Sequence, residues 1–198
     1  MKKVIVATKN KGKAKDFEAL FHPYGFSVLT LHDVADDMDI EETGETFQEN
    51  AILKAEALSQ RLNMFVIADD SGLIIDALNG APGVYSARYA GESKSDDANM
   101  DKVLEELSNI EDPDRTARFY CAIALAGPDF ETKTVYGTCE GVIAREKKGT
   151  NGFGYDPIFY VPQLGKMMAE LSAEEKGSIS HRGNAIKKIQ AELPNLFK

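Results

Sequence analysis

The order of strand-like and helix-like segments is the feature that most constrains the fold of this chain. Apolar, β-branched runs predict strands at 3–8, 26–31, 65–69, 117–126 and 133–143. Apolar residues at helical spacing predict helices at 12–22, 45–62, 95–108 and 183–193. Strands and helices alternate in the first part, and a hairpin across residues 127–131 follows. This order favours an α/β fold with a central mixed β-sheet flanked by helices, rather than an all-parallel sheet.

A polar loop follows the first predicted strand and leads into the first predicted helix. The loop consists of Thr8, Lys9, Asn10, Lys11, Gly12 and Lys13. The first backbone N–H groups of a helix have no partner within the helix, and the helix dipole favours negative charge there. Lysines and a hydroxyl around such an end suit a polyphosphate, although the Walker spacing is absent. The alternative is an ordinary solvated helix N-terminus with Asn10 as its cap.

Two adjacent aspartates, Asp69 and Asp70, follow the apolar run 65–68, and Ser71-Gly72 is predicted to end that strand. In open α/β sheets, ligands and catalytic groups collect at the carboxyl ends of strands. Carboxylates there can hold Mg²⁺ or accept a proton from a water nucleophile. The alternative is a capping aspartate at a junction between a strand and a turn.

The second predicted helix places a lysine on its apolar side. Phe47, Ala51, Ala55, Leu58 and Leu62 form one stripe, into which Lys54 projects, with Asn50 at the edge. A lysine facing a core is costly unless its ammonium meets an anion. The acidic loop 39–46 precedes this helix and would aim a carboxylate at the same pocket. A snorkelling lysine and a merely solvated loop are the alternatives.

The last third of the chain contains a glycine-rich aromatic segment and a cationic helix start. The segment 149–157 combines glycines with Phe153 and Tyr155, so that the backbone can approach a planar ligand on which a ring stacks. His181 and Arg182 open the last predicted helix. His181 alone is more typical of a structural histidine, and its neighbour Arg182 is the reason to consider a functional role.

Composition excludes several classes of protein. The net charge is −9, and such a surface repels a nucleic-acid backbone, so a small phosphorylated molecule is the better ligand. With 43% apolar and 28% charged residues, the sequence is typical of one folded domain spanning 1–198. No apolar run approaches a membrane span, and no signal peptide is evident. Cys121 and Cys139 are interpreted as buried thiols in a reducing compartment, which predicts a cytoplasmic location.

Taken together, the motifs resemble the Ham1/RdgB family of inosine/xanthosine triphosphate pyrophosphatases. The resemblance covers nearly the whole chain, and its combined spacing is specific although each motif alone is weak. The motifs are Thr8-Lys9-Asn10 with Lys13, Glu41-Glu42 with Gly44, Asn50-Ala51 with Lys54-Ala55, Asp69 to Leu73, Gly80 to Arg88, Gly152 to Phe159 and Ser180-His181-Arg182. The resemblance implies an elongated, two-lobed single domain with a cleft, a homodimer, and Mg²⁺ dependence with Mn²⁺ as an alternative. It also implies hydrolysis of ITP, dITP and XTP to the monophosphate and pyrophosphate, which cleanses the nucleotide pool.

The resemblance further implies roles for single residues. The loop Thr8–Lys13 would bind the triphosphate, Glu41 and Asp70 would hold the metal, and Asp70 would be the proton acceptor. Lys54 and Ser71 would contact the substrate near that centre. The base would be held by Phe153, Gly154, Tyr155, Asp156, Lys176, His181 and Arg182.

Three other functions compete with this interpretation. A Maf-like pyrophosphatase would act on pyrimidine or modified nucleotides, and a nucleotide sensor would bind without turnover. A glycosidase also uses two carboxylates. However, adjacent Asp69 and Asp70 point to opposite sides of a strand, and a lysine-rich loop has no role in a glycosidase.

Overall fold

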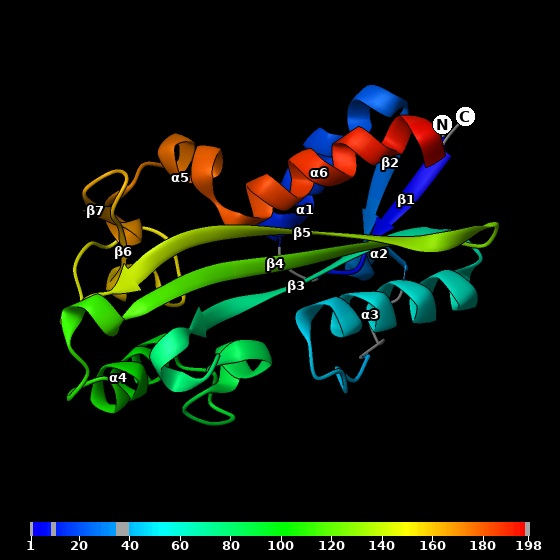
Figure 1. Ribbon diagram of the computed structural model, residues 1–198. Helices are drawn as coiled ribbons and strands as arrows, with labels where there is room; N and C mark the ends of the chain where they lie inside the picture. Colours follow the sequence, from blue (N-terminus) through cyan, green and yellow to red (C-terminus); the bar gives the residue numbers. More distant parts are fainter. Residues whose placement is uncertain (1, 9–10, 35–39, 197–198) are drawn as a thin grey trace. The chain divides into compact units, whose positions relative to one another are not determined.

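The computed structural model describes residues 2–8, 11–34 and 40–196, and it confirms the predicted α/β class with a mixed sheet flanked by helices (Figure 1). The strands are β1 (Lys2–Val6), β2 (Phe26–Thr30), β3 (Phe65–Ile75), β4 (Thr116–Gly127), β5 (Phe130–Ile143), β6 (Phe159–Val161) and β7 (Lys166–Met167). The α-helices are α1 (Lys11–Phe21), α2 (Leu31–Val34), α3 (Phe47–Leu62), α4 (Asp96–Glu106), α5 (Ala173–Ile179) and α6 (His181–Leu196). None of the helices in these described ranges is long and apolar enough to cross a membrane.

The seven strands are ordered β2-β1-β3-β4-β5-β6-β7. β1 pairs in parallel with both β2 and β3, whereas β6 pairs antiparallel with β5 and β7. β4 and β5 are neighbours, as the predicted hairpin requires. Parallel pairing therefore occurs on the amino-terminal side of the sheet order, where the strand–helix alternation of the sequence indicated it.

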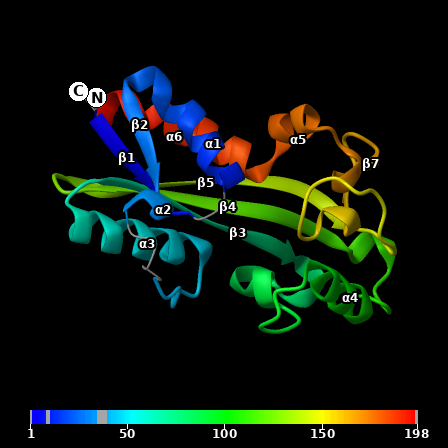
Figure 2. The same cartoon turned by 180° about the vertical axis from the view of Figure 1, so that it is seen from behind.

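The chain divides into two compact units, each with its own core. The first unit comprises Met1–Asp70, Cys121–Gly137 and Ala185–Lys198, and the second comprises Ser71–Tyr120 and Thr138–Asn184. In the first unit, α1 and α6 lie on one face of the strands and α3 lies on the other, as both views show (Figures 1 and 2). Side chains alternate between these faces: Val4, Val6 and Ile67 pack in the cluster with α1 and α6.

The prediction that Ser71-Gly72 ends the third strand is wrong, because β3 continues to Ile75. Gly72 does not have a positive φ. Leu73 and Ile75 are fully buried in the core of the second unit, and this burial outweighs the weak strand preference of glycine. Asp69 and Asp70 therefore lie within a strand and not at its end. The register between β1 and β3 stops at Ile67, so both aspartates still lie just past the carboxyl end of the parallel pairing.

Three elements near the predicted site were not foreseen in the sequence. The short strands β6 and β7 and the seven-residue helix α5 have too few residues to show a clear period. Helix α5 matters most for the site, because it carries Lys176. Its start is nevertheless encoded locally: Ser172 accepts a hydrogen bond from the backbone of Glu175, whose side chain accepts one in return.

Candidate active site

The main group of the candidate site in the first unit is the carboxylate of Asp70 on β3, which contacts side chains of α3. Asn50 Nδ2 donates a hydrogen bond to Asp70 Oδ2 at 3.1 Å, and Lys54 Nζ lies 4.0 Å from Asp70 Oδ1. The Asp70 side chain is 14% exposed, so it is shielded but reachable. The sequence placed Asp70 and Lys54 at one centre, and the structure brings them together.

Local sequence explains why α3 presents these two groups. Thr46 caps the helix, accepting a hydrogen bond from the Glu49 backbone, while the Glu49 carboxylate accepts one from the Thr46 backbone. Asn50 and Lys54 are four residues apart and therefore share one side of the helix. The predicted apolar stripe is buried at Phe47, Ala51, Ala55 and Leu58. Leu62, its last predicted member, is only half-buried.

Lys54 joins the carboxylate of Asp70 to two further acceptors. Its ammonium donates to the main-chain oxygen of Asp69 at 2.8 Å and forms an ion pair with Glu42. Burial by itself would lower the pKa of Lys54, but the charges of Asp70 and Glu42 outweigh it and hold that pKa above its ordinary value. Lys54 is therefore a permanent positive charge beside Asp70, not a proton acceptor.

The acidic loop contributes Glu42 to this lysine, whereas Glu41, the glutamate named as a metal ligand, is solvent-exposed. In the described part of the chain, no group of three or more His, Cys, Asp or Glu side chains is arranged to hold a metal ion. Mg²⁺ commonly binds through one or two carboxylates, with waters and substrate phosphates completing its shell. The oxygen donors of Asp70 and the acidic loop fit that kind of shared site.

Asp69 occupies the opposite side of β3 from Asp70, as predicted for adjacent strand residues. Its carboxylate is 2% exposed and accepts a hydrogen bond from Lys13 Nζ of α1 at 2.7 Å. Lys13 thus does more than the sequence predicted, because it also compensates a buried carboxylate. Thr8 is buried at the start of the loop that follows β1, and Lys11 and Gly12 begin α1. Lys9 and Asn10 lie outside the described residues.

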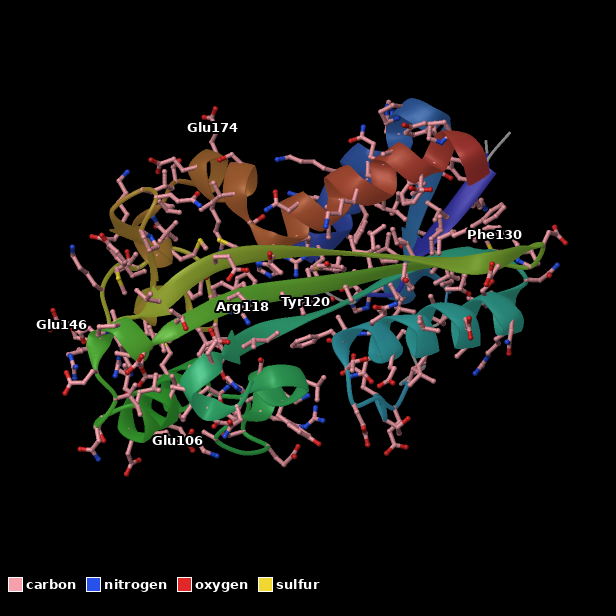
Figure 3. The ribbon with its side chains drawn as sticks, in the orientation of Figure 1. Glu106, Arg118, Tyr120, Phe130, Glu146 and Glu174 are labelled. Carbon is pink, nitrogen blue, oxygen red and sulfur yellow. The ribbon has the colours of Figure 1, made fainter. Side chains whose placement is uncertain are left out.

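The second unit contains the aromatic segment, which is organised by one buried carboxylate. Asp156 is 3% exposed, accepts a hydrogen bond from the Phe153 backbone at 3.0 Å and forms an ion pair with Lys176. Burial raises the pKa of Asp156 above its ordinary value, although Lys176 opposes that rise. The Lys176 ammonium also lies 4.9 Å from the centre of the Phe153 ring. On α5, by contrast, Glu174 points away from the rest of the ribbon (Figure 3).

Phe153 is 62% exposed, so its ring is presented to solvent rather than packed in the core. The neighbouring residues are anchored instead. The Gly154 backbone donates to the Asp96 carboxylate at 2.7 Å, and the Tyr155 hydroxyl donates to the Ser86 main-chain oxygen at 2.7 Å. Tyr155 is buried, so its side chain anchors the segment to the core of the second unit. An exposed ring on an anchored backbone suits stacking with a planar base.

The start of α6 supplies the remaining predicted residues. The His181 ring stacks on Phe119, with ring centres 5.1 Å apart and planes 20° from parallel. Arg182 Nη2 lies 3.4 Å from Ser71 Oγ, a long hydrogen bond that links two residues predicted for the site. The next residue, Gly183, has no room for a side chain, because a Cβ atom there would lie 2.6 Å from the Gly177 main-chain oxygen.

Sequence reasoning did not name Asp96 and Phe119 of the second unit at all. It named Asn50, Glu42 and Ser86 only within motifs, without a role in the site, and it did not foresee that Asp69 pairs with Lys13. Among these, Asn50 carried the clearest signal, since it stands one helical turn before Lys54 on the same side of α3. The others depend on contacts between segments far apart in the sequence.

Comparison with known proteins identifies the chain. The model of the Ham1 family matches residues 4–192, nearly the full length. This chain belongs to the Ham1 family. The dITP/XTP pyrophosphatase of Bacillus cereus is 59% identical over 199 residues, covering 100% of this chain and 97% of the relative. That of Halalkalibacterium halodurans is 60% identical over 193 residues, covering 98% of this chain and 100% of the relative.

Solved structures of Ham1 proteins agree with the fold. The Staphylococcus aureus Ham1 protein matches with a TM-score of 0.94 at 55% identity, covering 98% of this chain and 100% of that one. The Coxiella burnetii HAM1 protein matches with a TM-score of 0.92 at 44% identity, with the same coverage. The predicted family, fold and enzyme class, a hydrolase acting on acid anhydrides, are therefore confirmed.

Gly152 offers a direct test of the aromatic segment. Its φ is +82°, and an added Cβ would lie 1.9 Å from Asp156 Oδ2, where no atom fits. We expect Gly152→Ala to break the contact between Asp156 and Lys176 and to raise KM for the nucleoside triphosphate about tenfold, by loss of one or two hydrogen bonds. Gly25→Ala is the matched control: its φ is +75°, but its Cβ would meet nothing within 4 Å, and it lies outside the predicted site. Equal KM values for the two variants would contradict the role of Asp156.

Proposed function

We propose that this Ham1-family protein hydrolyses the non-canonical purine nucleoside triphosphates dITP, XTP and ITP to the nucleoside monophosphate and pyrophosphate, in a metal-dependent reaction. The observation that carries the proposal is the carboxylate of Asp70, held by Asn50 beside the ammonium of Lys54. The names of the relatives, dITP/XTP pyrophosphatases, support the choice of substrates.

The reaction needs a proton acceptor for water and positive charge for the phosphates. Asp70 would take a proton from the water whose oxygen forms the new bond to the α-phosphorus. The bond from that phosphorus to the bridging oxygen then breaks, and pyrophosphate leaves with that oxygen. Lys54 and the loop Thr8–Lys13 would bind the phosphates, and Lys54 would offset the negative charge that grows during transfer.

A divalent cation, Mg²⁺ or Mn²⁺, would be held by Asp70 and a glutamate of the acidic loop, and would supply charge neutralisation at the phosphates when bound. Glu41 is the glutamate that the family resemblance names, while Glu42 is the one that contacts Lys54.

Glutamine substitutions separate the two glutamates. The variant that removes a metal ligand should raise the Mg²⁺ concentration for half-maximal activity about tenfold or more. Removing a residue that is only hydrogen-bonded to a metal ligand already lowers metal affinity about tenfold to a hundredfold. We expect this for Glu41→Gln, with Glu42→Gln as the matched neighbour. Binding of Mn²⁺ measured by electron paramagnetic resonance gives a readout without turnover. The reverse ranking would transfer the ligand role to Glu42.

The base would be recognised by residues of the second unit. Phe153 would stack on the purine, and Lys176, His181 and Arg182 are the candidate donors to its 6-oxo group. ATP carries an amine at that position, so the same donors would disfavour it. Asp156 contributes by orienting Lys176 and the Phe153 backbone.

The test is a panel of ITP, dITP, XTP, ATP, GTP and dTTP with Mg²⁺, in which pyrophosphate is resolved from phosphate. Pyrophosphate released from the first three and little from the others supports the proposal. Binding without release of pyrophosphate would identify a sensor, and a preference for pyrimidines would identify a Maf-like activity. Either result would refute the proposed function.

We also propose that the protein is a cytoplasmic homodimer. Sedimentation velocity measures the assembly, and cell fractionation measures the location.

A further inference from the structure

Two buried asparagines occupy the same position in two helices and make different contacts. Asn50 is the fourth residue of α3 and Asn99 the fourth residue of α4, and each is 2% exposed. Each accepts a hydrogen bond from a backbone N–H outside its helix: Gly44 donates to Asn50 Oδ1 at 2.8 Å, and Ala90 donates to Asn99 Oδ1 at 2.7 Å. Both asparagines therefore anchor a loop to the first turn of a helix.

The amide nitrogens distinguish them. Asn99 Nδ2 donates to two main-chain oxygens, those of Ser86 at 3.4 Å and Ala87 at 3.3 Å. Asn50 Nδ2 instead donates to the carboxylate of Asp70 at 3.1 Å. Anchoring of a loop accounts for the hydrogen bonds of Asn99, all of which join it to main-chain groups. It does not account for the hydrogen bond from Asn50 to a carboxylate.

The direction of the Asn50 amide follows from hydrogen-bond chemistry. A backbone N–H can only donate, so the amide oxygen must face Gly44 and the NH₂ group must face Asp70. Gly44 itself has no room for a side chain, since an added Cβ would lie 2.7 Å from Asn50 Oδ1 and 2.7 Å from Glu49 Cβ. The acidic loop therefore locks the amide in one orientation.

We propose that Asn50 is a positioning residue for hydrolysis, which fixes the plane of the Asp70 carboxylate and couples it to the acidic loop. This inference rests on the proposed function, in which Asp70 accepts the proton of water. Asn50 binds one carboxylate oxygen, and the other faces Lys54 at 4.0 Å. With each oxygen assigned to a different neighbour, the carboxylate cannot rotate without losing a contact.

The primary test is Asn50→Asp, which keeps the size and the acceptor for Gly44 but removes the donor to Asp70. A misplaced catalytic group slows the chemical step and leaves ground-state binding nearly unchanged. We expect kcat for ITP to fall roughly tenfold or more, with KM within about threefold of the parent. Asn99→Asp is the matched control, because it makes the same substitution at the same helical position. It should lower Tm and leave kcat within about threefold. A similar loss of kcat in both variants would overturn the inference.

A second variant displaces the amide without changing its chemistry. In Gly44→Ala the new methyl group pushes on Asn50 Oδ1, so kcat should fall while Asn50 and Asp70 are both present. Gly177→Ala is the control, because a Cβ there meets nothing within 4 Å and φ is not positive. Parent-like kcat in Gly44→Ala together with parent-like kcat in Asn50→Asp would refute the positioning role.

The double variant Asn50→Asp/Asp70→Asn separates this inference from the proposed function. It restores a hydrogen bond of reversed direction, so its Tm should be higher than that of Asn50→Asp, while its turnover should be absent because the carboxylate at position 70 is gone. No recovery of Tm would mean that the two side chains are not coupled, and the inference fails. If Asp70→Asn alone retained turnover, the proposed function would fail instead, whatever the Asn50 variants did.

Discussion

Replacing Asp70 by asparagine is expected to abolish turnover of ITP while leaving the fold intact. An amide can neither accept the proton of water nor neutralise a cation, and a general base alone typically supplies about 10²–10⁴-fold in rate. The asparagine has the same shape, and its oxygen can still accept the hydrogen bond from Asn50. Lys54 keeps its contacts with Glu42 and with the main-chain oxygen of Asp69. The measurements are kcat in saturating Mg²⁺ and Tm by calorimetry.

Asp76→Asn is the control for that variant. Asp76 is an exposed carboxylate that accepts hydrogen bonds from Thr116 and Arg118, so its loss changes a surface ion pair of small energetic weight. It should therefore leave kcat unchanged. If Asp70→Asn turned over ITP within about threefold of the parent, Asp70 would not be the proton acceptor.

Removing the Arg182 guanidinium is expected to narrow the preference for ITP over ATP. A buried donor or acceptor left unpaired costs about 1–3 kcal/mol, which corresponds to roughly fivefold to a hundredfold in kcat/KM. The loss in Arg182→Ala should fall chiefly on ITP, because only the 6-oxo base accepts the donated hydrogen bond. His181→Ala should act in the same direction if its ring reads the same edge of the base. The measurement is kcat/KM for both nucleotides.

The matched control is Arg118→Ala, which removes an arginine of the same unit (Figure 3). Its side chain is bound to Asp76 and Glu140. Its two kcat/KM values should keep the ratio of the parent. An equal loss of kcat/KM for ITP and for ATP in Arg182→Ala would show that this guanidinium binds phosphate or ribose and not the base. The 3.4 Å contact with Ser71 makes that the main alternative, because Ser71 follows Asp70 directly in the chain.

Local pattern was sufficient for the elements that carry the predicted residues. Helix α3 was predicted at 45–62 and observed at Phe47–Leu62, because an apolar stripe and a capping threonine are encoded within one segment. The opposite orientations of Asp69 and Asp70 also followed from the period of a strand, and the structure confirms them through Lys13 on one side and Asn50 on the other. Such features depend only on neighbours in the sequence.

The end of β3 could not be predicted, because Gly72 favours a break locally while the burial of Leu73 and Ile75 in a distant core favours continuation. The ion-pair and hydrogen-bond partners of the charged groups could not be predicted from the sequence either. Lys13 is separated from Asp69 by 56 positions, and Arg182 from Ser71 by 111. Ion pairs and hydrogen bonds act over a few ångströms, so their partners are defined only when the chain has folded.

The sequence by itself therefore determined the family, the order of the five long strands and of the four long helices, and the residue types that the chemistry requires. The tertiary structure decided how those residues are used: Asp69 is compensated by Lys13, Asp70 is oriented by Asn50, and Asp156 organises the aromatic segment. The physical reason is that charge and hydrogen-bonding capacity belong to each side chain, whereas orientation and burial belong to its surroundings. A carboxylate becomes a proton acceptor or a structural anchor according to the neighbours that the fold supplies.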